Sequence, residues 1–404
     1  MVIDRTLLIT ISGIDAPGVT SSIFESLSHS PVVVIDMEQL VVRGHLTLAI
    51  ALELESGLED SRASTELDSV RKRVRIAASA HNMEVATRPG VTLTVDHSSE
   101  KFQVIVMGSP LHPECIEVVT STIAQHGGNL DRIHRIADYP VTAIRFEGSG
   151  VAPSVLRRPL AEVSARCHVD ISVQDVALEA RGQYLVVMDV DSTLIQEEVV
   201  DVLGELAGVG PAISKITLAA MNGELDFAQA LQARVALLGG APATLLDKVR
   251  DMITLTPGAR TLCRTLNRLG YHIVLVSGGF TNVIELIAQE LEVSAFRANT
   301  LEVIDGKITG RLLGPIIDRE GKKQALLDFA EQFQIPNRRT IAIGDGANDI
   351  DMISEAGLGV AFNAKMALRE SADTTVNVPY LDSILYLLGI TRDEIVRSEQ
   401  FQRD

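Results

Sequence analysis

The sequence predicts an α/β protein in which two small βαββαβ domains precede a larger domain, built on a parallel sheet with a small helical cap. The chain has 404 residues, which is too long for one ordinary domain. One order of strand and helix patterns occurs twice before residue 180. Further along, Leu185 to Met188 is a short apolar run without polar alternation, which is typical of a strand buried on both faces of a parallel sheet.

The composition argues against several classes of partner. Hydrophobic residues make up 46% of the chain, Trp is absent and aromatics are 4%, so we expect aliphatic cores and no aromatic platform for single-stranded nucleic acid. A formal net charge of −17 also disfavours a polyanionic partner. Cys115, Cys167 and Cys263 lie far apart without CxxC spacing, so we expect small core residues rather than metal ligands or disulfides.

The N-terminus predicts neither export nor membrane insertion. Residues 1–15 contain no basic region followed by a signal-type apolar core, and the sequence has no run of about 18 apolar residues. We therefore expect a cytoplasmic protein without a membrane partner.

The first βαββαβ pattern is expected to span residues 1–90. Alternating apolar residues predict a first strand from Arg5, and a turn-rich loop with Asp15 and Gly18 leads into a helix over 19–27. Glycine lets a ligand approach the backbone closely, and amides at a helix start suit a carboxylate, although such glycines also serve simply to make tight turns. The remaining elements are expected at 32–42, 46–54, 61–82 and 83–87.

The second pattern is expected to span residues 91–178, in the same order. Gly108 follows the first strand of this pattern, at the place that the loop with Asp15 and Gly18 takes in the first pattern. Because small βαββαβ domains with exposed sheet edges commonly pair, we expect a homodimer. Strands are predicted at 102–107, 129–136, 141–146 and 169–173, and helices at 115–125 and 155–167.

These loops carry a family resemblance. Residues 13–19, together with Ile35-Asp36-Met37-Glu38-Gln39 in the second strand, resemble the ACT domain, a regulatory domain that binds amino acids. The second copy, with Gly108 and residues 127–130, resembles a more divergent member that lacks the fuller loop. The resemblance implies effector binding near Asp15, Gly18 and Gly108.

Two carboxylates, Asp189 and Asp191, come directly after the apolar strand at 185–188. In open α/β sheets, ligands bind beyond the carboxyl ends of the strands. At such a place one carboxylate can attack as a nucleophile while the other acts as acid and base. The alternative is that both are turn and helix-capping residues.

Two further clusters suit an anion. A predicted strand at 272–276 ends in Ser277, Gly278 and Gly279 before a helix over 280–290, and a hydroxyl with backbone amides at a helix start can hold phosphate. Lys322 precedes a helix over 324–333, a position that is mildly unfavourable for a cation unless an anion lies nearby. Each cluster taken alone has an alternative interpretation: Ser277-Gly278-Gly279 as an ordinary strand-to-helix turn, and Lys322 as a solvated charge.

A third cluster suits a divalent cation. The strand predicted at 340–343 ends in Gly344-Asp345-Gly346-Ala347-Asn348-Asp349. Oxygen-bearing side chains separated by glycines suit Mg²⁺, which binds to one or two carboxylates and keeps several waters. We expect Asp345 as the direct ligand, with Asn348 and Asp349 as supporting groups beside the metal and the substrate.

In this order, DVDST, SGG, Lys322 and GDGAND resemble the haloacid dehalogenase superfamily of aspartyl-phosphate enzymes over residues 184–390. The resemblance implies a Rossmann-like core in which Asp189 attacks phosphorus, while Asp191 protonates the leaving oxygen and then activates water. It also implies Mg²⁺ held by the carboxylates of Asp189 and Asp345 and by the backbone carbonyl of Asp191. The phosphoryl oxygens would be held by Ser277, the amide of Gly278 and Lys322.

The parallel-sheet domain is expected to span residues 182–396, with the cap at about 197–251. Helical patterns at 199–207, 213–221 and 227–237 predict a cap that excludes water and admits only small substrates.

Within the cap, Glu198 with Met221, Phe227 and Arg234 resembles the phosphoserine phosphatase family. There the acid meets the substrate amino group, the arginine meets its carboxylate, and Met and Phe line the pocket. Alternatively, these residues are ordinary core and surface charges. The resemblance implies hydrolysis of O-phospho-L-serine, the last step of serine biosynthesis, with L-serine as the expected effector.

Two other functions stay open on the sequence. One is a phosphatase of the same superfamily for another small phosphomonoester. The other is a regulatory or binding protein that keeps the fold without the chemistry, and the intact Asp189, Asp191, Lys322 and Asp345 argue against it.

Overall fold

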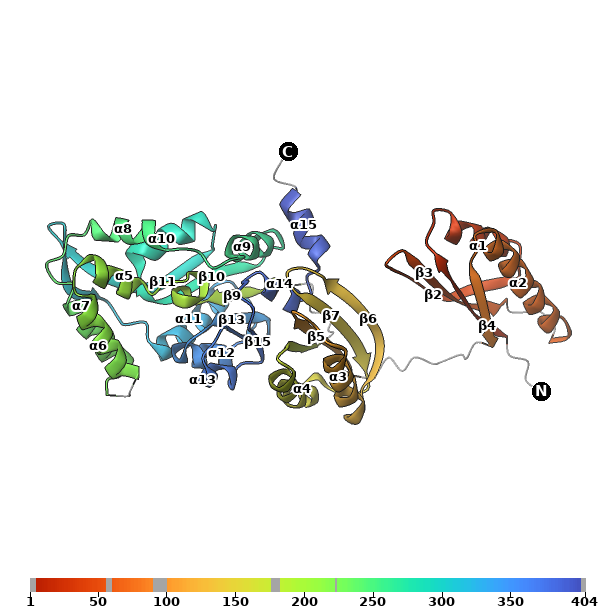
Figure 1. Ribbon diagram of the computed structural model, residues 1–404, viewed down its shortest axis with the longest axis horizontal. Helices are drawn as coiled ribbons and strands as arrows, with labels where there is room; N and C mark the ends of the chain where they lie inside the picture. The colour runs from red at the N-terminus through yellow and green to blue at the C-terminus, as the bar shows by residue number, and fades with distance from the viewer. Residues whose placement is uncertain (1–4, 56–59, 90–99, 176–181, 222–223, 401–404) are drawn as a thin grey trace. The chain divides into compact units, whose positions relative to one another are not determined.

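A computed structural model describes residues 5–55, 60–89, 100–175, 182–221 and 224–400. The chain divides into two compact units, one up to His97 and one from Ser98 onward. Each unit is described by itself (Figure 1). None of the helices in the described ranges is long and apolar enough to cross a membrane.

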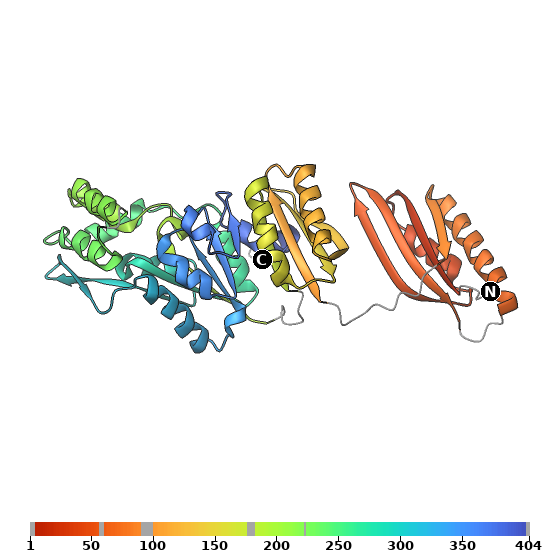
Figure 2. The same ribbon diagram turned by 90° about the horizontal axis from the view of Figure 1, so that it is seen from below.

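The first unit is a βαββαβ domain, as predicted. Its antiparallel sheet has the order β2-β3-β1-β4, and α1 and α2 lie on one face of it (Figure 2). Leu7, Ile9 and Ile11 of β1 point to the helices and are fully buried, which confirms the alternation in the sequence. The elements are β1 (Thr6–Ile14), α1 (Val19–Leu27), β2 (Val32–Val42), β3 (His45–Leu54), α2 (Asp60–Ala80) and β4 (Glu84–Pro89).

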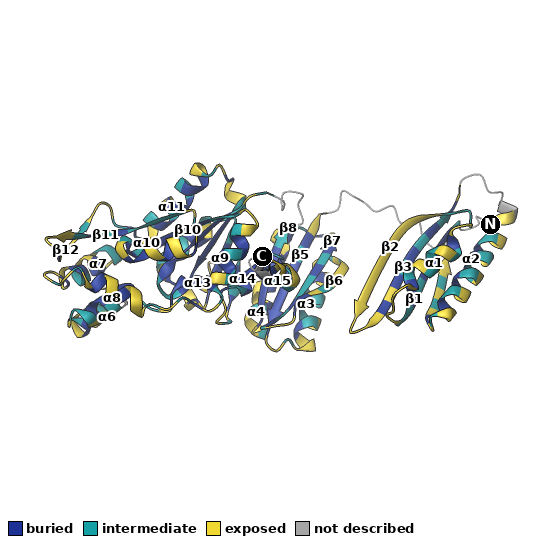
Figure 3. Ribbon diagram, turned by 90° about the horizontal axis from the view of Figure 1, so that it is seen from above, coloured by how far each residue is buried: buried dark blue, intermediate teal, exposed yellow. Residues whose placement is uncertain are grey.

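Strand β2 forms an exposed edge of this sheet. Nearly every residue of β2 is exposed within this unit, as Figure 3 shows by colour. Val34, Met37 and Leu40 are each about half exposed, at 50, 48 and 52%. A long apolar edge strand of this kind is a ready surface for pairing with another strand.

The second unit begins with another βαββαβ domain, whose sheet has the order β6-β7-β5-β8. Helices α3 and α4 begin two residues earlier than predicted, at Pro113 and Pro153, because proline is favoured in the first turn, where its missing N–H is not needed. The elements are β5 (Lys101–Gly108), α3 (Pro113–Gln125), β6 (Asn129–Ala137), β7 (Thr142–Ser149), α4 (Pro153–Cys167) and β8 (Asp170–Asp175).

Residues 185–400, here called the parallel-sheet domain, contain a seven-stranded sheet of order β12-β11-β10-β9-β13-β14-β15. Its strands run parallel except β12, which pairs antiparallel with β11. Strand β9 lies between β10 and β13 and is fully buried, as its continuous apolar run predicts. The strands are β9 (Leu185–Met188), β10 (His272–Phe280), β11 (Ala295–Ile304), β12 (Lys307–Leu313), β13 (Thr340–Gly344), β14 (Leu358–Phe362) and β15 (Thr374–Val376).

Strand β10 differs from the prediction. It continues through Ser277, Gly278 and Gly279 to Phe280, and its helix starts one residue later than expected. The pairing with β11 shifts between Val276 and Phe280, so these residues remain extended without regular pairing.

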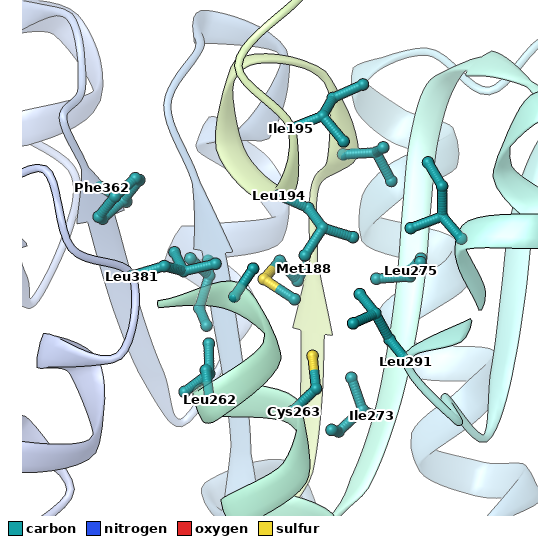
Figure 4. Packing of buried hydrophobic residues seen from close by; sticks show 14 of the residues in the cluster. Met188, Leu194, Ile195, Leu262, Cys263, Ile273, Leu275, Leu291, Phe362 and Leu381 are labelled. Carbon is teal, nitrogen blue, oxygen red and sulfur yellow. The ribbon is translucent and has the colours of Figure 1, made fainter. Parts of the chain in front are cut away.

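Aliphatic side chains fill the space between the sheet and its helices. Figure 4 shows Met188 of β9 near Leu262 and Cys263 of α9, and Leu275 of β10 beside Leu291. The cysteines are free, and Cys115 and Cys263 are buried core residues as predicted, whereas Cys167 is half-buried. The flanking helices are α9 (Ala259–Arg268), α10 (Thr281–Glu290), α11 (Arg319–Gln332), α12 (Ile350–Glu355), α13 (Met366–Arg369), α14 (Ser383–Leu387) and α15 (Arg392–Gln400).

Between β9 and β10 the chain forms the predicted helical insertion. Its fourth helix, α8, was not predicted, because the short apolar stripe of this helix is interrupted by charges. The helices of the cap are α5 (Val199–Leu206), α6 (Gly210–Met221), α7 (Phe227–Ala236) and α8 (Leu245–Met252).

The second βαββαβ domain and the parallel-sheet domain share one buried core. Ile105, Met107 and Ala143 belong to the same cluster as Tyr386 and Leu387 of α14. The Arg145 guanidinium donates to the carbonyl of Gly389, and the Gln174 side-chain Nε2 donates to the carbonyl of Leu387. These carbonyls lie at or just beyond the end of α14, where helix carbonyls lack partners within the helix.

Candidate active site

The carboxyl ends of β9, β10 and β13 bring the predicted residues together. Asp189 directly follows β9 and is 3% exposed, and its amide donates to the carbonyl of Ile343 on β13 at 2.9 Å. Carboxylate oxygens of Asp189, Asp345 and Asp349 lie within 4.8 Å of one another. Parallel neighbours end at the same edge of a sheet, so residues 160 positions apart can meet there.

Lys322 lies between two of these carboxylates and is fully buried. Its Nζ is 2.8 Å from Asp189 Oδ1 and 2.7 Å from Asp349 Oδ1. Asp318 caps the helix that carries it, accepting from the Gly321 amide at 2.9 Å. Burial alone would lower the pKa of Lys322, but Asp189 and Asp349 outweigh that effect and raise it.

The carboxylates exceed the cations in this pocket. Burial, and then the charge of Asp349, raise the pKa of Asp189 well above its ordinary value. The same two causes raise the pKa of Asp345 to about 6. Three clustered carboxylates with one buried lysine leave an excess of negative charge, which a hard divalent cation with oxygen ligands would neutralise. The donor set therefore fits Mg²⁺.

Asp191 lies on the other side of the turn that follows β9. Its Oδ1 accepts from the Val199 amide at the start of α5 at 2.9 Å, and its Oδ2 accepts from Ser277 Oγ at 3.2 Å. Asp191 thus has the capping contact of the alternative interpretation, but it also faces the candidate phosphate loop. Burial, and then the charge of Glu198, raise the pKa of Asp191 to about 7, which suits a group that both gives and takes a proton.

The loop at the end of β10 has no room for side chains at its glycines. A Cβ on Gly279 would lie 2.7 Å from Asp191 Oδ2, and a Cβ on Gly278 would lie 2.8 Å from Cζ of Phe227. Ser277 is fully buried, and its Oγ accepts from the Gly279 amide at 2.8 Å. Phe227, at the start of α7, therefore packs directly over the loop.

The remaining predicted pocket residues come from the cap. Glu198 is exposed, and its Oε1 accepts from Ser192 Oγ at 3.0 Å. Arg234 on α7 is half-buried and makes a long bond of 3.4 Å from Nε to the carbonyl of Ala230. Met221 ends α6, but its side chain lies outside what the structure describes. Asn348 is half-buried beside Gly346.

Three buried residues hold the site together and were not identified in the sequence. Thr193 Oγ1 donates to Asp345 Oδ1 at 3.1 Å, and Thr256 Oγ1 donates to the Thr193 carbonyl at 2.7 Å. Asn299 on β11 is 1% exposed: its side-chain Nδ2 donates to the Gly278 carbonyl at 2.8 Å, and its Oδ1 accepts from the backbone amide of Ile317 at 2.9 Å. Thr193 stands within DVDST, but Thr256 and Asn299 lie in no recognisable motif.

The predicted effector residues lie in the βαββαβ domains. Gly18 precedes α1 with φ of 92°, and apart from Gly18 and its chain neighbours no atom of the described residues lies within 4 Å of the position its Cβ would take. Asp15 is exposed in the same loop, and its amide donates to the Gly44 carbonyl at 2.9 Å. In the second domain, a Cβ on Gly108 would lie 3.2 Å from Cγ1 of Val169 and 3.3 Å from the carbonyl of Pro110, so that loop is tighter.

Family profiles match three segments of the chain. The haloacid dehalogenase-like hydrolase profile matches residues 186–354, and two ACT domain profiles match residues 5–87 and 100–174. These segments agree with the resemblances inferred from the sequence.

Relatives match nearly the whole length. A phosphoserine phosphatase of Streptomyces coelicolor is 47% identical over 400 residues, covering 99% of this chain and 96% of the relative. Phosphoserine phosphatase SerB2 of Mycobacterium tuberculosis is 45% identical, covering 96% of this chain and 94% of that protein. Among solved structures, a probable phosphoserine phosphatase from Vibrio cholerae is 30% identical, with a TM-score of 0.58 over 77% of this chain and 91% of its own.

The buried aspartate after the central strand and the lysine bonded to it agree with the 45–47% identity to these relatives over nearly the full length. The chain belongs to the phosphoserine phosphatase family of haloacid dehalogenase-like hydrolases, with two ACT domains ahead of the hydrolase.

Proposed function

We propose that the chain hydrolyses O-phospho-L-serine to L-serine and phosphate with Mg²⁺, through a phosphorylated Asp189, as the last step of serine biosynthesis. The observation that carries this proposal is the position of Asp189, which is buried against Lys322 with Asp191 across the turn. A nucleophile, a neutralising cation and a carboxyl with pKa about 7 are the groups that phosphoryl transfer to a carboxylate requires.

The residues would act in two steps. A carboxylate oxygen of Asp189 bonds to phosphorus as the serine oxygen leaves, and Asp191 gives that oxygen its proton. Asp191, now a carboxylate, takes a proton from a water that attacks the phosphorus of phospho-Asp189, which releases phosphate and restores both groups. Lys322, Ser277 and the Gly278 amide would hold the phosphoryl oxygens, with Asn348 beside them.

Mg²⁺ would be held by the carboxylates of Asp189 and Asp345 and the backbone carbonyl of Asp191, with Asp349 in support. When bound, the cation would supply charge neutralisation at the phosphoryl group. Asp349 would support the site indirectly, because it bonds both Lys322 and the Gly346 amide, the latter at 3.1 Å.

The substrate assignment rests on the cap. Arg234 would bind the carboxylate, Glu198 the amino group, and Met221 and Phe227 would line the pocket. Phosphate release from L-phosphoserine, phosphothreonine and a simple aryl phosphate, with and without Mg²⁺, tests the whole proposal. Metal-dependent turnover that strongly favours phosphoserine is expected, whereas equal rates on all three would keep the chemistry and discard the substrate.

Arg234→Gln should lower kcat/KM for phosphoserine by about 100-fold, because charge-assisted bonds to the substrate carboxylate are lost. Hydrolysis of a simple aryl phosphate, which has no carboxylate, should change little. The matched control is Arg250→Gln on α8. The Arg250 guanidinium is exposed, and its Nε lies 4.0 Å from Asp251 Oδ1, so it is only weakly paired. Equal losses on both substrates would contradict the assignment of Arg234.

Glu198→Gln should shift the pH dependence of kcat. Asp191 must be protonated to act as an acid, so activity should fall as pH rises through its pKa of about 7. Glu198 is the largest charge that raises this pKa, so its removal should move the alkaline limb to lower pH. The test uses an alkyl phosphate without an amino group as substrate. The control is Glu197→Gln, because the Glu197 carboxylate accepts from the Thr254 amide instead, and this variant should leave the alkaline limb in place.

For regulation, we propose that L-serine binds the first ACT domain near Asp15 and Gly18, with a second site near Gly108. Gly18→Ala should abolish inhibition by millimolar serine and leave the uninhibited rate unchanged. Because φ at Gly18 is 92°, alanine also strains the backbone, so Gly306→Ala, with φ of 71° in an open hairpin, is the control for strain. Serine inhibition that survives Gly18→Ala would exclude that loop.

Two structural assignments belong to the same proposal. The boundaries are 1–90 and 91–178 for the ACT domains and 182–396 for the hydrolase with its cap at 197–251. A homodimer would use the exposed apolar edge of β2.

A further inference from the structure

Asp170 is a buried carboxylate at the boundary between the second ACT domain and the parallel-sheet domain. It is the first residue of β8 and is only 4% exposed. Its Oδ1 accepts from Asn377 Nδ2 at 2.7 Å and from Thr375 Oγ1 at 3.1 Å, and its Oδ2 accepts from the Asn377 amide at 3.1 Å. A carboxylate buried so deeply is costly unless it is well bonded, and these donors all come from the end of β15.

The bonds of Asp170 fix the peptide group between Val376 and Asn377. The N–H of this peptide donates to Asp170, and its carbonyl accepts from the Asn363 amide at 2.8 Å. Hydrogen bonds in series polarise and strengthen one another, so the charge of Asp170 makes this carbonyl a better acceptor. Asn363 has φ of 44°, a conformation that asparagine tolerates when its surroundings hold it.

Two residues beyond Asn363, the chain reaches the backbone of Asp345. The Lys365 amide donates to the backbone carbonyl of Asp345 at 3.1 Å. Asp345 supplies one of the clustered carboxylates. Continuous hydrogen bonds and short chain segments therefore lead from Asp170 to Asp345.

On its other side, Asp170 adjoins the tighter of the two candidate effector loops. It pairs with Met107 across β5 and β8, and Gly108 is the next residue on β5. Val169, which precedes Asp170, is the residue that a Cβ on Gly108 would contact at 3.2 Å. A ligand held at Gly108 would press on the segment that begins β8.

We infer that Asp170 is a positioning residue for Asp345, through which the second ACT domain sets the affinity of the hydrolase for its divalent cation. The inference rests on the proposed function, because it takes Asp345 as a metal ligand. Loss of the charge at Asp170 releases the end of β15 and the segment 363–365, and the Asp345 carboxylate is then held less firmly.

The test measures metal binding by the full-length chain without substrate. Mn²⁺ is titrated and followed by electron paramagnetic resonance, with Mg²⁺ as competitor. Asp170→Asn keeps the shape and removes the charge, and should weaken Mn²⁺ binding by about fivefold to tenfold, somewhat less than loss of a group bonded directly to a ligand. The exchanged pair Asp170→Asn with Asn377→Asp restores a side-chain bond in reverse and should recover most of the affinity.

The matched control is Gln174→Met on the same strand. Gln174 crosses the same domain boundary but bonds Leu387 on α14, away from β15. It should lower the melting temperature and leave Mn²⁺ affinity unchanged. If Asp170→Asn does not fold, Asn377→Ala, which removes only the shortest of these bonds, should weaken binding by a smaller factor.

Wild-type Mn²⁺ affinity in Asp170→Asn would overturn the inference, as would wild-type affinity in Asn377→Ala if Asp170→Asn does not fold. Equal weakening in Gln174→Met would also overturn it, because it would indicate general loosening of the boundary. The third such outcome is an exchanged pair that recovers no Mn²⁺ affinity. Failure of the proposed function is recognised separately, because the wild-type chain would then bind no divalent cation or release no phosphate from phosphoserine.

Discussion

Asp189→Asn should reduce phosphate release from phosphoserine by about 10⁴-fold or more, the largest effect expected of any single change in this chain. The amide is nearly the same size, so the buried strand end should keep its shape. It is a very poor nucleophile, however, and it cannot carry the charge that pairs with Lys322 at 2.8 Å. The measurement is single-turnover phosphate release at saturating Mg²⁺.

The control is Asp328→Asn, which removes a carboxylate that is 40% exposed and pairs with Arg297 on the surface of the same domain. Its rate should stay close to that of the wild type. Trapping of a phosphorylated protein in the wild type but not in Asp189→Asn would identify the nucleophile. Retention of a phosphorylated species in the variant would show that another group attacks.

Lys322→Met should inactivate the enzyme and also destabilise it. Removing one member of a buried ion pair typically costs about 3–5 kcal/mol, because the other member stays buried without compensation. Here Asp189 and Asp349 would face each other without the cation between them. Unfolding in urea without metal should show the loss as a lower midpoint.

The loss should grow as pH rises. The pKa of Asp189 is raised in the folded protein, so above its ordinary value of 3.8 the folded state holds more protons than the unfolded state and stability falls with increasing pH. Without Lys322 this pKa rises further, so the variant should lose more stability at pH 7 than at pH 5. A deficit that stays constant with pH would contradict this account.

The adjacent residue provides the control. Lys323 Nζ is 2.7 Å from Glu355 Oε2, but its side chain is 34% exposed. Lys323→Met should change the free energy of unfolding only slightly, as is usual for exposed pairs. Activity should also be retained, because Lys323 has no contact with the carboxylate cluster among the described interactions.

The sequence predicts the gathering of the site residues because each lies directly after a strand or at a helix start. Asp189 follows β9, Asp345 follows β13, and the order of a parallel sheet then brings them to one edge. Local patterns therefore suffice for these groups, while their chemical roles stay predictions. The alternating apolar residues of β1 and the continuous run of β9 were equally informative about the fold.

Residues that act between segments were not predictable. Asn299 joins the Gly278 carbonyl to the Ile317 amide, and nothing near position 299 in the sequence indicates either partner. The same holds for Asp170, whose partners lie 205 and 207 residues further along the chain. The contacts of Asp170 depend on how two sheets are placed together, and those of Asn299 depend on how β11 meets the segment before α11. Hydrophobic periodicity encodes neither arrangement.

The shared core of the second ACT domain and the hydrolase also bears on how this architecture is inherited. In the described part of the first unit, the buried cluster consists only of residues between Leu7 and Met83. A gene rearrangement that ends between residues 90 and 99 would expose neither core. A rearrangement that begins at Tyr184 would leave Tyr386 and Leu387 as an exposed apolar patch. The first ACT domain can therefore be exchanged without opening either buried cluster, whereas loss of the second would call for polar replacements on α14.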